Sequence, residues 1–468
     1  MLFFFRKRPQ ASRKNQKRKS KTVTQNYKCK KMTQKILILF FLFFQALHSQ
    51  NSVQKVLIGG VAHIGNGEVI ENTTIIISDG KIKQIGPVDE VYFSPKESEI
   101  IDVSGKHIYP SLILPNSTLG LAEIDAVRAS RDEKEVGNFN SNVRSQIAYN
   151  AESIVISTVR TNGILLAQVT PRGGLIGGRS SIMKLDGNNW QDATYLEDDG
   201  LHIYWPETYH RGHWIHSHDF TSKDKEVEKE DLASKKIKKS ILELYDFFDN
   251  AQQYNLLKKK TLDLRFDGLK DLFIGNATLY LHANTVNGMK QAILFAKHYN
   301  IDKIVIVGAA ESWRITDFIL EHNVSIVLER THSLPSYEDS DIDQPFKTPK
   351  ILKDKGILFC LNYQGDMERM GSRNLPFLGG TTVAYGLSKE EALELMTFNA
   401  AKILGIEDRT GTLELGKDAN LFVSSGDILD IMSHNVELLF LMGEEVNLTN
   451  HQTRLYDRYK SLESIDQF

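Results

Sequence analysis

The sequence predicts an α/β fold, a (β/α)₈ barrel accompanied by a small β-rich module. Residues 111–405 alternate short apolar runs with segments of helical spacing, which is typical of parallel strands joined by crossover helices. Residues 53–104 instead alternate apolar and polar positions, with glycine at the turns, as short strands do. A length of 468 residues suits a barrel plus a smaller module.

The N-terminal part, residues 1–49, has the pattern of a basic extension followed by a secretory signal peptide. Lys35 precedes a short apolar run from Ile36 to Phe44, and small or polar residues follow this run. The run is short for a membrane span. We therefore expect export to the periplasm or outside, with no membrane attachment after cleavage. An uncleaved anchor and a basic arm are the alternatives, and both Met1 and Met32 remain candidate starts.

Charge and cysteine content exclude several classes of protein. Residues 1–49 hold 13 Lys and Arg residues and no acidic residue, so a total net charge of −2 leaves −15 on the remainder. An acidic body of this kind argues against a nucleic-acid partner. The two cysteines are Cys29 and Cys360, and cleavage leaves only the second. Neither an intramolecular disulfide nor a cysteine-based zinc site is then available.

The first module, residues 50–110, is predicted to consist of short strands. Asp79-Gly80 lies between two alternating segments and is a strong hairpin signal. The barrel begins with the apolar run Leu112 to Leu114, which is bounded by prolines and reads as a buried strand. Further buried strands are predicted at 163–169, 277–282, 303–308, 325–328 and 356–361, helices at 289–299 and 313–322, and a solvated helical insertion at about 221–262.

Asn116 and Thr118 follow the first barrel strand. The stretch from Pro110 to Gly120 resembles the first barrel strand of the amidohydrolase superfamily, nearest to its imidazolonepropionase-like branch. In that family the strand ends in a His-x-His pair that binds a metal, and here Asn116-Ser117-Thr118 replaces the pair. An amide or a hydroxyl is a much weaker zinc ligand than an imidazole. The resemblance therefore implies a metal-dependent-hydrolase barrel with a degenerate metal site.

A second match lies near the C-terminal end. Thr397 to Gly405 and Gly411 to Val423 are similar to the family's Thr-x-Asn-Pro-Ala-Lys-x-Leu-Gly and Gly-Ser-Leu-Glu-x-Gly-Lys-x-Ala-Asp-Leu motifs. In the family this joint returns the chain to a β-sandwich that both chain ends build. The implied organisation is a sandwich of residues 50–110 and 406–450, a barrel of residues 111–405, and a tail of residues 451–468.

The resemblance also implies positions for site residues. His282 stands where the family places a metal-binding histidine at the end of the fifth strand, so it is the candidate ligand for a divalent metal such as zinc. The barrel aspartate, which serves as base in the family, falls near Asp366 or Asn362, and only an aspartate can act as a base. Asp366 is therefore the catalytic candidate.

Five residues are candidates for contacting a substrate: Asn116, Thr118, Arg172, Glu311 and His332. Arg172 belongs to a glycine-rich run at the expected pocket rim, where it could bind an anion; the alternative is a tight turn that needs glycine. Glu311 is either a pocket carboxylate or an acid at a helix N-terminus. His332 either lines the mouth of the barrel or belongs to a loop.

Two functions follow from the resemblance. The first is hydrolysis of a carbon–nitrogen bond, such as that of a cyclic amide, with a metal-activated hydroxide and activity impaired by the missing ligands. The second is a catalytically inactive homologue that binds a small-molecule ligand or acts as scaffold for an active amidohydrolase. Homo-oligomerisation and pairing with an active relative are both expected modes of association, and fold alone does not establish activity.

Overall fold

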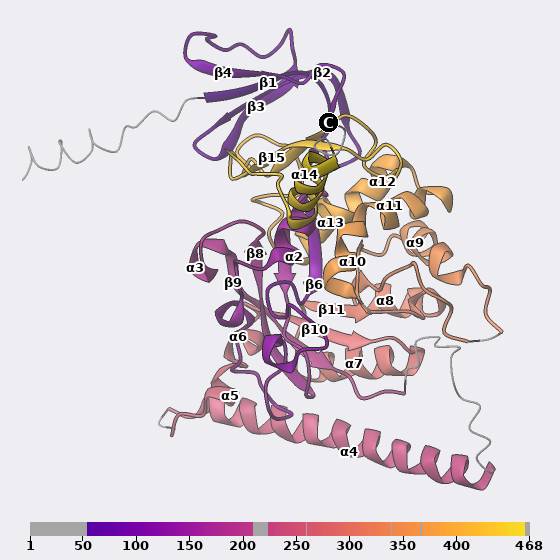
Figure 1. The fold of residues 1–468 in the computed structure, drawn as a ribbon. Coiled ribbons are helices and arrows are strands. Elements are labelled where there is room, and N and C mark those ends of the chain that lie inside the picture. The colour runs from indigo at the N-terminus through magenta and orange to yellow at the C-terminus, as the bar shows by residue number, and fades with distance from the viewer. Residues whose placement is uncertain (1–53, 209–222, 259, 338, 366, 464–468) are drawn as a thin grey trace, which may run out of the picture. The chain divides into compact units, whose positions relative to one another are not determined.

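The computed structural model describes residues 54–208, 223–258, 260–337, 339–365 and 367–463. The predicted signal peptide and the candidate base Asp366 lie outside the described residues. Within the described part, two eight-stranded sheets form the framework (Figure 1). One is the barrel sheet, and the other, called the terminal sheet here, combines strands from both ends of the chain. No described helix has the length and apolar character needed to cross a membrane.

The terminal sheet confirms the prediction of a module built from both chain ends. Its strand order is β16-β15-β14-β5-β1-β2-β3, with β4 paired to β1. The predicted turn Asp79-Gly80 joins β2 to β3, and both of its residues have positive φ. The strands are β1 (Gln54–His63), β2 (Val69–Ser78), β3 (Lys81–Pro87), β4 (Ser98–Asp102), β5 (His107–Pro110), β14 (Leu421–Ser424), β15 (Val436–Leu441) and β16 (Glu444–Glu445).

The barrel sheet has the order β13-β12-β11-β10-β9-β8-β7-β6. Helices α12 and α13 contact both end strands, β6 and β13, and so cover the seam between them. Strands β6, β7, β11 and β13 are buried along their whole length, as expected for strands packed on both faces. The strands are β6 (Leu112–Ser117), β7 (Ile164–Val169), β8 (Ile176–Lys184), β9 (Thr194–Tyr204), β10 (Thr278–Ala283), β11 (Ile304–Gly308), β12 (Ser325–Leu328) and β13 (Phe359–Leu361).

One strand departs from a regular (β/α)₈ arrangement. β8 runs antiparallel to both β7 and β9, whereas the other neighbouring pairs of the barrel sheet are parallel. The connection from β7 to β8 is too short for a crossover helix, so the chain must turn back on itself. Gly173 and Gly174 in this connection have φ values of 86° and 71°. The glycine-rich run is thus a tight turn followed by a strand.

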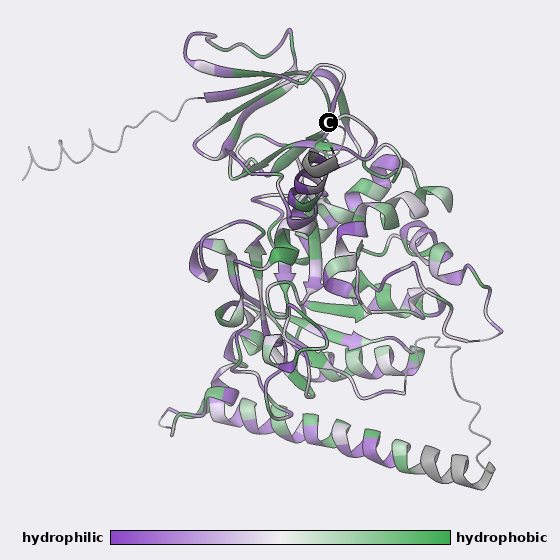
Figure 2. Cartoon of the chain, in the orientation of Figure 1, coloured by the Kyte–Doolittle hydropathy of each residue, from purple (hydrophilic) through white to green (hydrophobic). Residues whose placement is uncertain are grey.

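Helices follow the parallel strands, and Figure 1 shows α7, α8 and α9 on the outer side of β10 and β11. These strands are largely hydrophobic in Figure 2 and belong to one continuous barrel core. The helices are α2 (Ile154–Arg160), α3 (Trp190–Ala193), α4 (Lys223–Leu256), α5 (Leu264–Asp267), α6 (Lys270–Phe273), α7 (Val286–His298), α8 (Thr316–Glu321), α9 (Gln344–Asp354), α10 (Glu368–Gly371), α11 (Leu375–Ala384), α12 (Lys389–Met396), α13 (Phe398–Ile403) and α14 (His451–Glu463), with 3₁₀ turns at Arg128–Ser130, Ser145–Ala148, Ser312–Arg314 and Ser372–Asn374.

The insertion predicted at about 221–262 contains the long helix α4. Its second half is not a solvated helix, because Leu244, Phe247, Phe248 and Ala251 are buried on one face. The ring of Phe248 contacts Phe295 of α7 in an edge-on arrangement at 4.8 Å between centroids. The many charged residues of this segment favour the prediction of a solvated helix, although its apolar residues form a stripe of helical spacing.

Asp418 connects the terminal sheet to the barrel. It is buried and accepts hydrogen bonds from Lys81 Nζ of β3 at 2.8 Å, from Tyr195 OH of β9 at 2.7 Å and from Arg409 Nη2 at 3.4 Å. We expect Asp418→Ala to lower the free energy of unfolding by about 1–3 kcal/mol, because three donors lose their acceptor. Urea unfolding measures this. Glu444→Ala, which removes an exposed ion pair with Lys55, is the control and should cost less than about 0.5 kcal/mol. Equal costs for the two variants would contradict the role of Asp418.

Candidate functional site

Asn116 stands at the carboxyl end of β6, where a barrel of this kind places its active site. It is fully buried and has a φ of 49°, a left-handed conformation that asparagine tolerates better than most residues. Its backbone N–H donates to Gln168 Oε1 at 3.0 Å, and its side-chain Nδ2 donates to Gln364 Oε1 at 3.0 Å. Asn116 is thus held on two sides.

Arg172 follows β7, and its guanidinium reaches the end of β6. It donates from Nη1 to Asn116 Oδ1 at 2.8 Å, and from Nη2 to Asn116 O at 2.9 Å and to Glu368 Oε1 at 3.2 Å. Thr118 Oγ1 donates to the same Glu368 oxygen at 2.6 Å. The structure therefore brings three predicted residues, Asn116, Thr118 and Arg172, into one network with Glu368. Arg172 is already paired with a carboxylate and does not project from the rim towards an anion.

The charge of Arg172 is fixed by its surroundings. The side chains of Arg172 and Glu368 are only 17% and 13% exposed. Burial opposes the charge on the guanidinium, but the Glu368 carboxylate and the Tyr204 phenol hold the pKa of Arg172 above its ordinary value. A permanent positive charge therefore lies beside the end of β6.

His282 lies near the carboxyl end of β10, as predicted, and its partner is a second histidine. His282 Nε2 lies 2.9 Å from His202 Nδ1 of β9, and His202 Nε2 lies 2.8 Å from Ser180 Oγ of β8. Tyr204 stacks on the ring of His282 at 4.1 Å between centroids. Burial lowers the pKa of both histidines well below the ordinary value, and the positive charge of Arg172 lowers both further. Both imidazoles are consequently neutral at pH 7.

A deeper layer of polar groups lies below the two histidines. Asp199 Oδ2 accepts hydrogen bonds from Gln168 Nε2 at 2.7 Å and from Tyr280 OH at 2.9 Å. Gln168 also donates to Ser180 Oγ at 3.2 Å and so joins this layer to His202. Burial raises the pKa of Asp199 to about 6, although hydrogen bonds from Ser180, Gln168 and Tyr280 favour its charged form. The interior of the barrel is thus a connected polar network.

Sequence reasoning missed several members of this network, among them Gln168, Asp199, His202 and Glu368. A signal existed for one of them, because Leu201-His202-Ile203 repeats the apolar–His–apolar pattern of Leu281-His282-Ala283 at a neighbouring strand end. The carboxylate Glu368 had no such signal, since it comes from α10, 196 residues beyond its partner Arg172.

The residues that the structure describes do not fit a divalent metal ion. Among the described residues no group of three or more His, Cys, Asp or Glu side chains is arranged to hold one. The His282 and His202 nitrogens that face each other are hydrogen-bonded together, and zinc needs such nitrogens free and convergent. Arg172 adds a fixed positive charge whose effect already reaches both imidazoles. A second cation at this place would be repelled.

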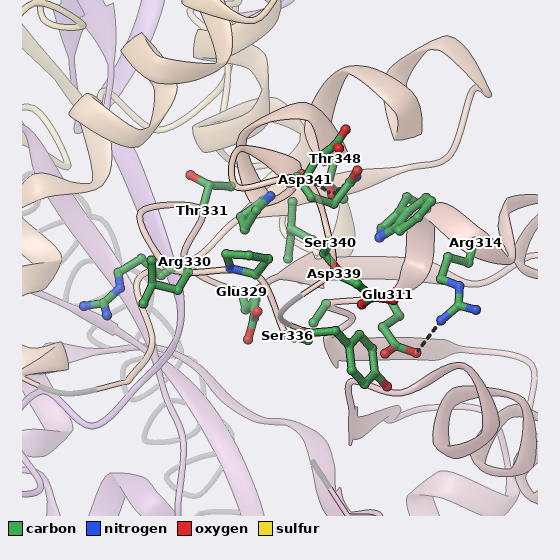
Figure 3. Close-up of a pocket in the computed structure, with 18 residues that line it drawn as sticks. Glu311, Arg314, Glu329, Arg330, Thr331, Ser336, Asp339, Ser340, Asp341 and Thr348 are labelled. Carbon is green, nitrogen blue, oxygen red and sulfur yellow. Dashed lines mark hydrogen bonds and ion pairs between the residues drawn. The ribbon is translucent and has the colours of Figure 1, made fainter. Parts of the chain in front are cut away.

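Glu311 and His332 lie away from this network. Glu311 follows β11, is 4% exposed, and lines a cavity of about 610 Å³ between the ends of β11 and β12 (Figure 3). Its Oε2 accepts the backbone N–H of Val286 at 2.8 Å, at the N-terminus of α7, so both sequence-based alternatives describe it. His332 is an exposed loop residue whose ring nitrogen Nε2 contacts Thr381 Oγ1.

Comparison with known proteins agrees with the fold. An amidohydrolase from Thermotoga maritima MSB8 superimposes with a TM-score of 0.68 at 21% identity, covering 84% of this chain and 99% of that one. A Xaa-Pro dipeptidase with methionine bound in its active site gives a TM-score of 0.50 at 14% identity, covering 84% and 100%. A search of curated proteins finds no match. The amidohydrolase family model matches residues 273–448. The chain is therefore similar to the amidohydrolase family over residues 273–448 and has the fold of the Thermotoga maritima amidohydrolase.

Proposed function

We propose that this protein is a ligand-binding member of the amidohydrolase superfamily whose barrel centre does not perform metal-dependent hydrolysis. The proposal depends on the contacts of Arg172. Its guanidinium donates hydrogen bonds to Asn116 and Glu368. Its positive charge also lowers the pKa of His202 and His282. Members of the superfamily generally bind a divalent metal at this end of the barrel. In this chain an internal cation and its carboxylate partner take up the position.

The engagement of Glu368 supports the same proposal. Its carboxylate accepts hydrogen bonds from Arg172 and Thr118. A general base must be within hydrogen-bond reach of the proton that it removes. A carboxylate that is engaged in this way is suited to holding the barrel together rather than to moving a proton.

Hydrolysis of a carbon–nitrogen bond is the second candidate function. It is favoured by the match of the family model to residues 273–448, which include His282 and the candidate base Asp366. Under this alternative the missing ligands impair the activity. For either function we propose a small-molecule ligand, export by the N-terminal signal, and association with a second copy or with an active relative.

Metal content separates the two functions. The purified protein is exposed to zinc, dialysed extensively and measured for bound metal. We expect well under one equivalent to remain, with the same small amount in His282→Ala. The facing nitrogens of His202 and His282 are hydrogen-bonded to each other, and the positive charge of Arg172 repels a metal cation. One equivalent retained by the wild type and lost in His282→Ala would refute the proposal and justify a screen with cyclic amides and dipeptides.

A further inference from the structure

The geometry points to a binding site for a cationic amine with an apolar body in the cavity beside Glu311. This inference rests on the proposed function in one respect, that the chain binds a small molecule. The cavity of about 610 Å³ lies within the usual range for small-molecule sites and stands apart from the network around Arg172. It is bounded by the ends of β11 and β12, the loop after β12 and helix α9 (Figure 3).

The first observation is an unsatisfied carboxylate oxygen. Glu311 has a side chain only 5% exposed, and its Oε1 makes no hydrogen bond within the protein. Its Oε2 accepts the N–H of Val286, which orients the carboxylate. Buried polar atoms are nearly always paired, and a buried charge without sufficient partners is costly. An ammonium group donating to Oε1 would remove that cost.

The second observation is the weak ion pair between Arg314 and Glu311. Arg314 Nη1 lies 3.7 Å from Glu311 Oε2, beyond hydrogen-bond distance, and the Arg314 side chain is 49% exposed. Figure 3 shows the two side chains pointing toward each other, while Arg330 points away from Glu311. The guanidinium of Arg330 lies 5.3 Å from the ring of Tyr363. Arg314 is therefore a rim charge that a ligand cation can displace.

The rest of the lining selects the same chemistry. Carboxylates outnumber guanidinium groups, because Glu329 and Asp339 join Glu311 against Arg314 and Arg330. The remaining carboxylate of the lining, Asp341, is paired with Lys347 at 2.8 Å. This excess of negative charge favours a cation over an anion.

Aromatic and apolar side chains provide the remaining contacts. Trp313 and Tyr337 line the cavity with Leu328 and Leu334, so an apolar body and a cation–π contact are both available. The Glu311 carboxylate raises the pKa of the Tyr337 phenol.

Calorimetric titration of the purified protein at pH 7 tests the inference with three probes of one shape: phenethylamine, 2-phenylethanol and 3-phenylpropionate. We expect phenethylamine to bind at least about tenfold more tightly than the neutral alcohol, since a hydrogen bond to a charged group adds this much. Glu311→Gln, which keeps the acceptor for Val286, should remove the preference for the amine. Arg314→Gln should raise the amine affinity, because it removes the competing cation. Glu321→Gln, an exposed charge outside the cavity, should change nothing.

Several outcomes would overturn the inference. These are no amine binding, equal binding of amine and alcohol, tighter binding of 3-phenylpropionate, or an amine preference that survives Glu311→Gln. If Glu311→Gln fails to fold, Arg314→Gln serves as the test. A lower phenethylamine affinity in Arg314→Gln than in the wild type then contradicts the inference. Zinc retention with amide hydrolysis would defeat the proposed function and leave the amine preference measurable, whereas metal-free protein that ignores the amine defeats this inference alone.

Discussion

Replacement of Arg172 with methionine is expected to lower the free energy of unfolding by about 3–5 kcal/mol, the usual cost of removing one partner from a buried ion pair. The charge of Glu368 would remain largely buried with only Thr118 as a side-chain donor, and Asn116 would lose both hydrogen bonds that its oxygens accept. Methionine fills the space of the arginine stem, so a cavity contributes little. Urea unfolding followed by circular dichroism measures the change.

A double-mutant cycle separates the pair from its surroundings. Adding Glu368→Gln to Arg172→Met should cost less than the sum of the single changes by about 1–3 kcal/mol, because the second change removes the stranded charge. Arg179→Met is the matched control: Arg179 pairs with Asp198, and Asp198 keeps Arg144 as a second partner. If Arg172→Met costs no more than Arg179→Met, the guanidinium is not what holds the barrel centre together.

Most of the fold could be predicted because it depends on local patterns. The run from Leu112 to Leu114 and the turn Asp79-Gly80 carry their own signals of apolar continuity and turn chemistry, and the structure contains a strand and a hairpin there. The antiparallel direction of β8 is harder to predict from the sequence. It depends on the shortness of the chain between Val169 and Ile176. The sequence leaves a pocket rim and a tight glycine turn open as alternatives there, and the structure contains the tight turn.

The site was predictable only in part. The sequence places Asn116 and Thr118 at the end of a buried strand and His282 at another strand end, and the structure has them there. The contact between Arg172 and Glu368 could not be predicted, because the two residues are 196 positions apart in the sequence. The direction in which an arginine points depends on such distant partners. Arg172, a candidate for binding an anion at the pocket rim, therefore contacts Glu368 instead.

The wild-type protein is expected to lose stability as the pH rises from about 4 to about 6, through Asp199. Burial raises its pKa in the folded state to about 6, above the ordinary value of 3.8. The folded state therefore binds the proton more tightly than the unfolded state, and stability falls as this proton is released. Above pH 6 the loss from this group is complete and amounts to about 3 kcal/mol.

Asp199→Asn removes this penalty while an amide oxygen accepts the same hydrogen bonds from Gln168 and Tyr280. We expect the variant to be about 2–3 kcal/mol more stable than the wild type at pH 7 and equal to it near pH 4, measured as the difference between their urea unfolding curves across pH. The adjacent Asp198→Asn is the control with the opposite sign. Asp198 pairs with Arg144 and Arg179, so its loss destabilises the protein at pH 7.

A gain in stability of Asp199→Asn at pH 7 would mean that the chain retains a charged aspartate in its barrel against its own stability, as proteins do where a buried charge serves binding or catalysis. A loss at pH 7 would instead assign Asp199 to the scaffold that holds Gln168, and through it Asn116, in place.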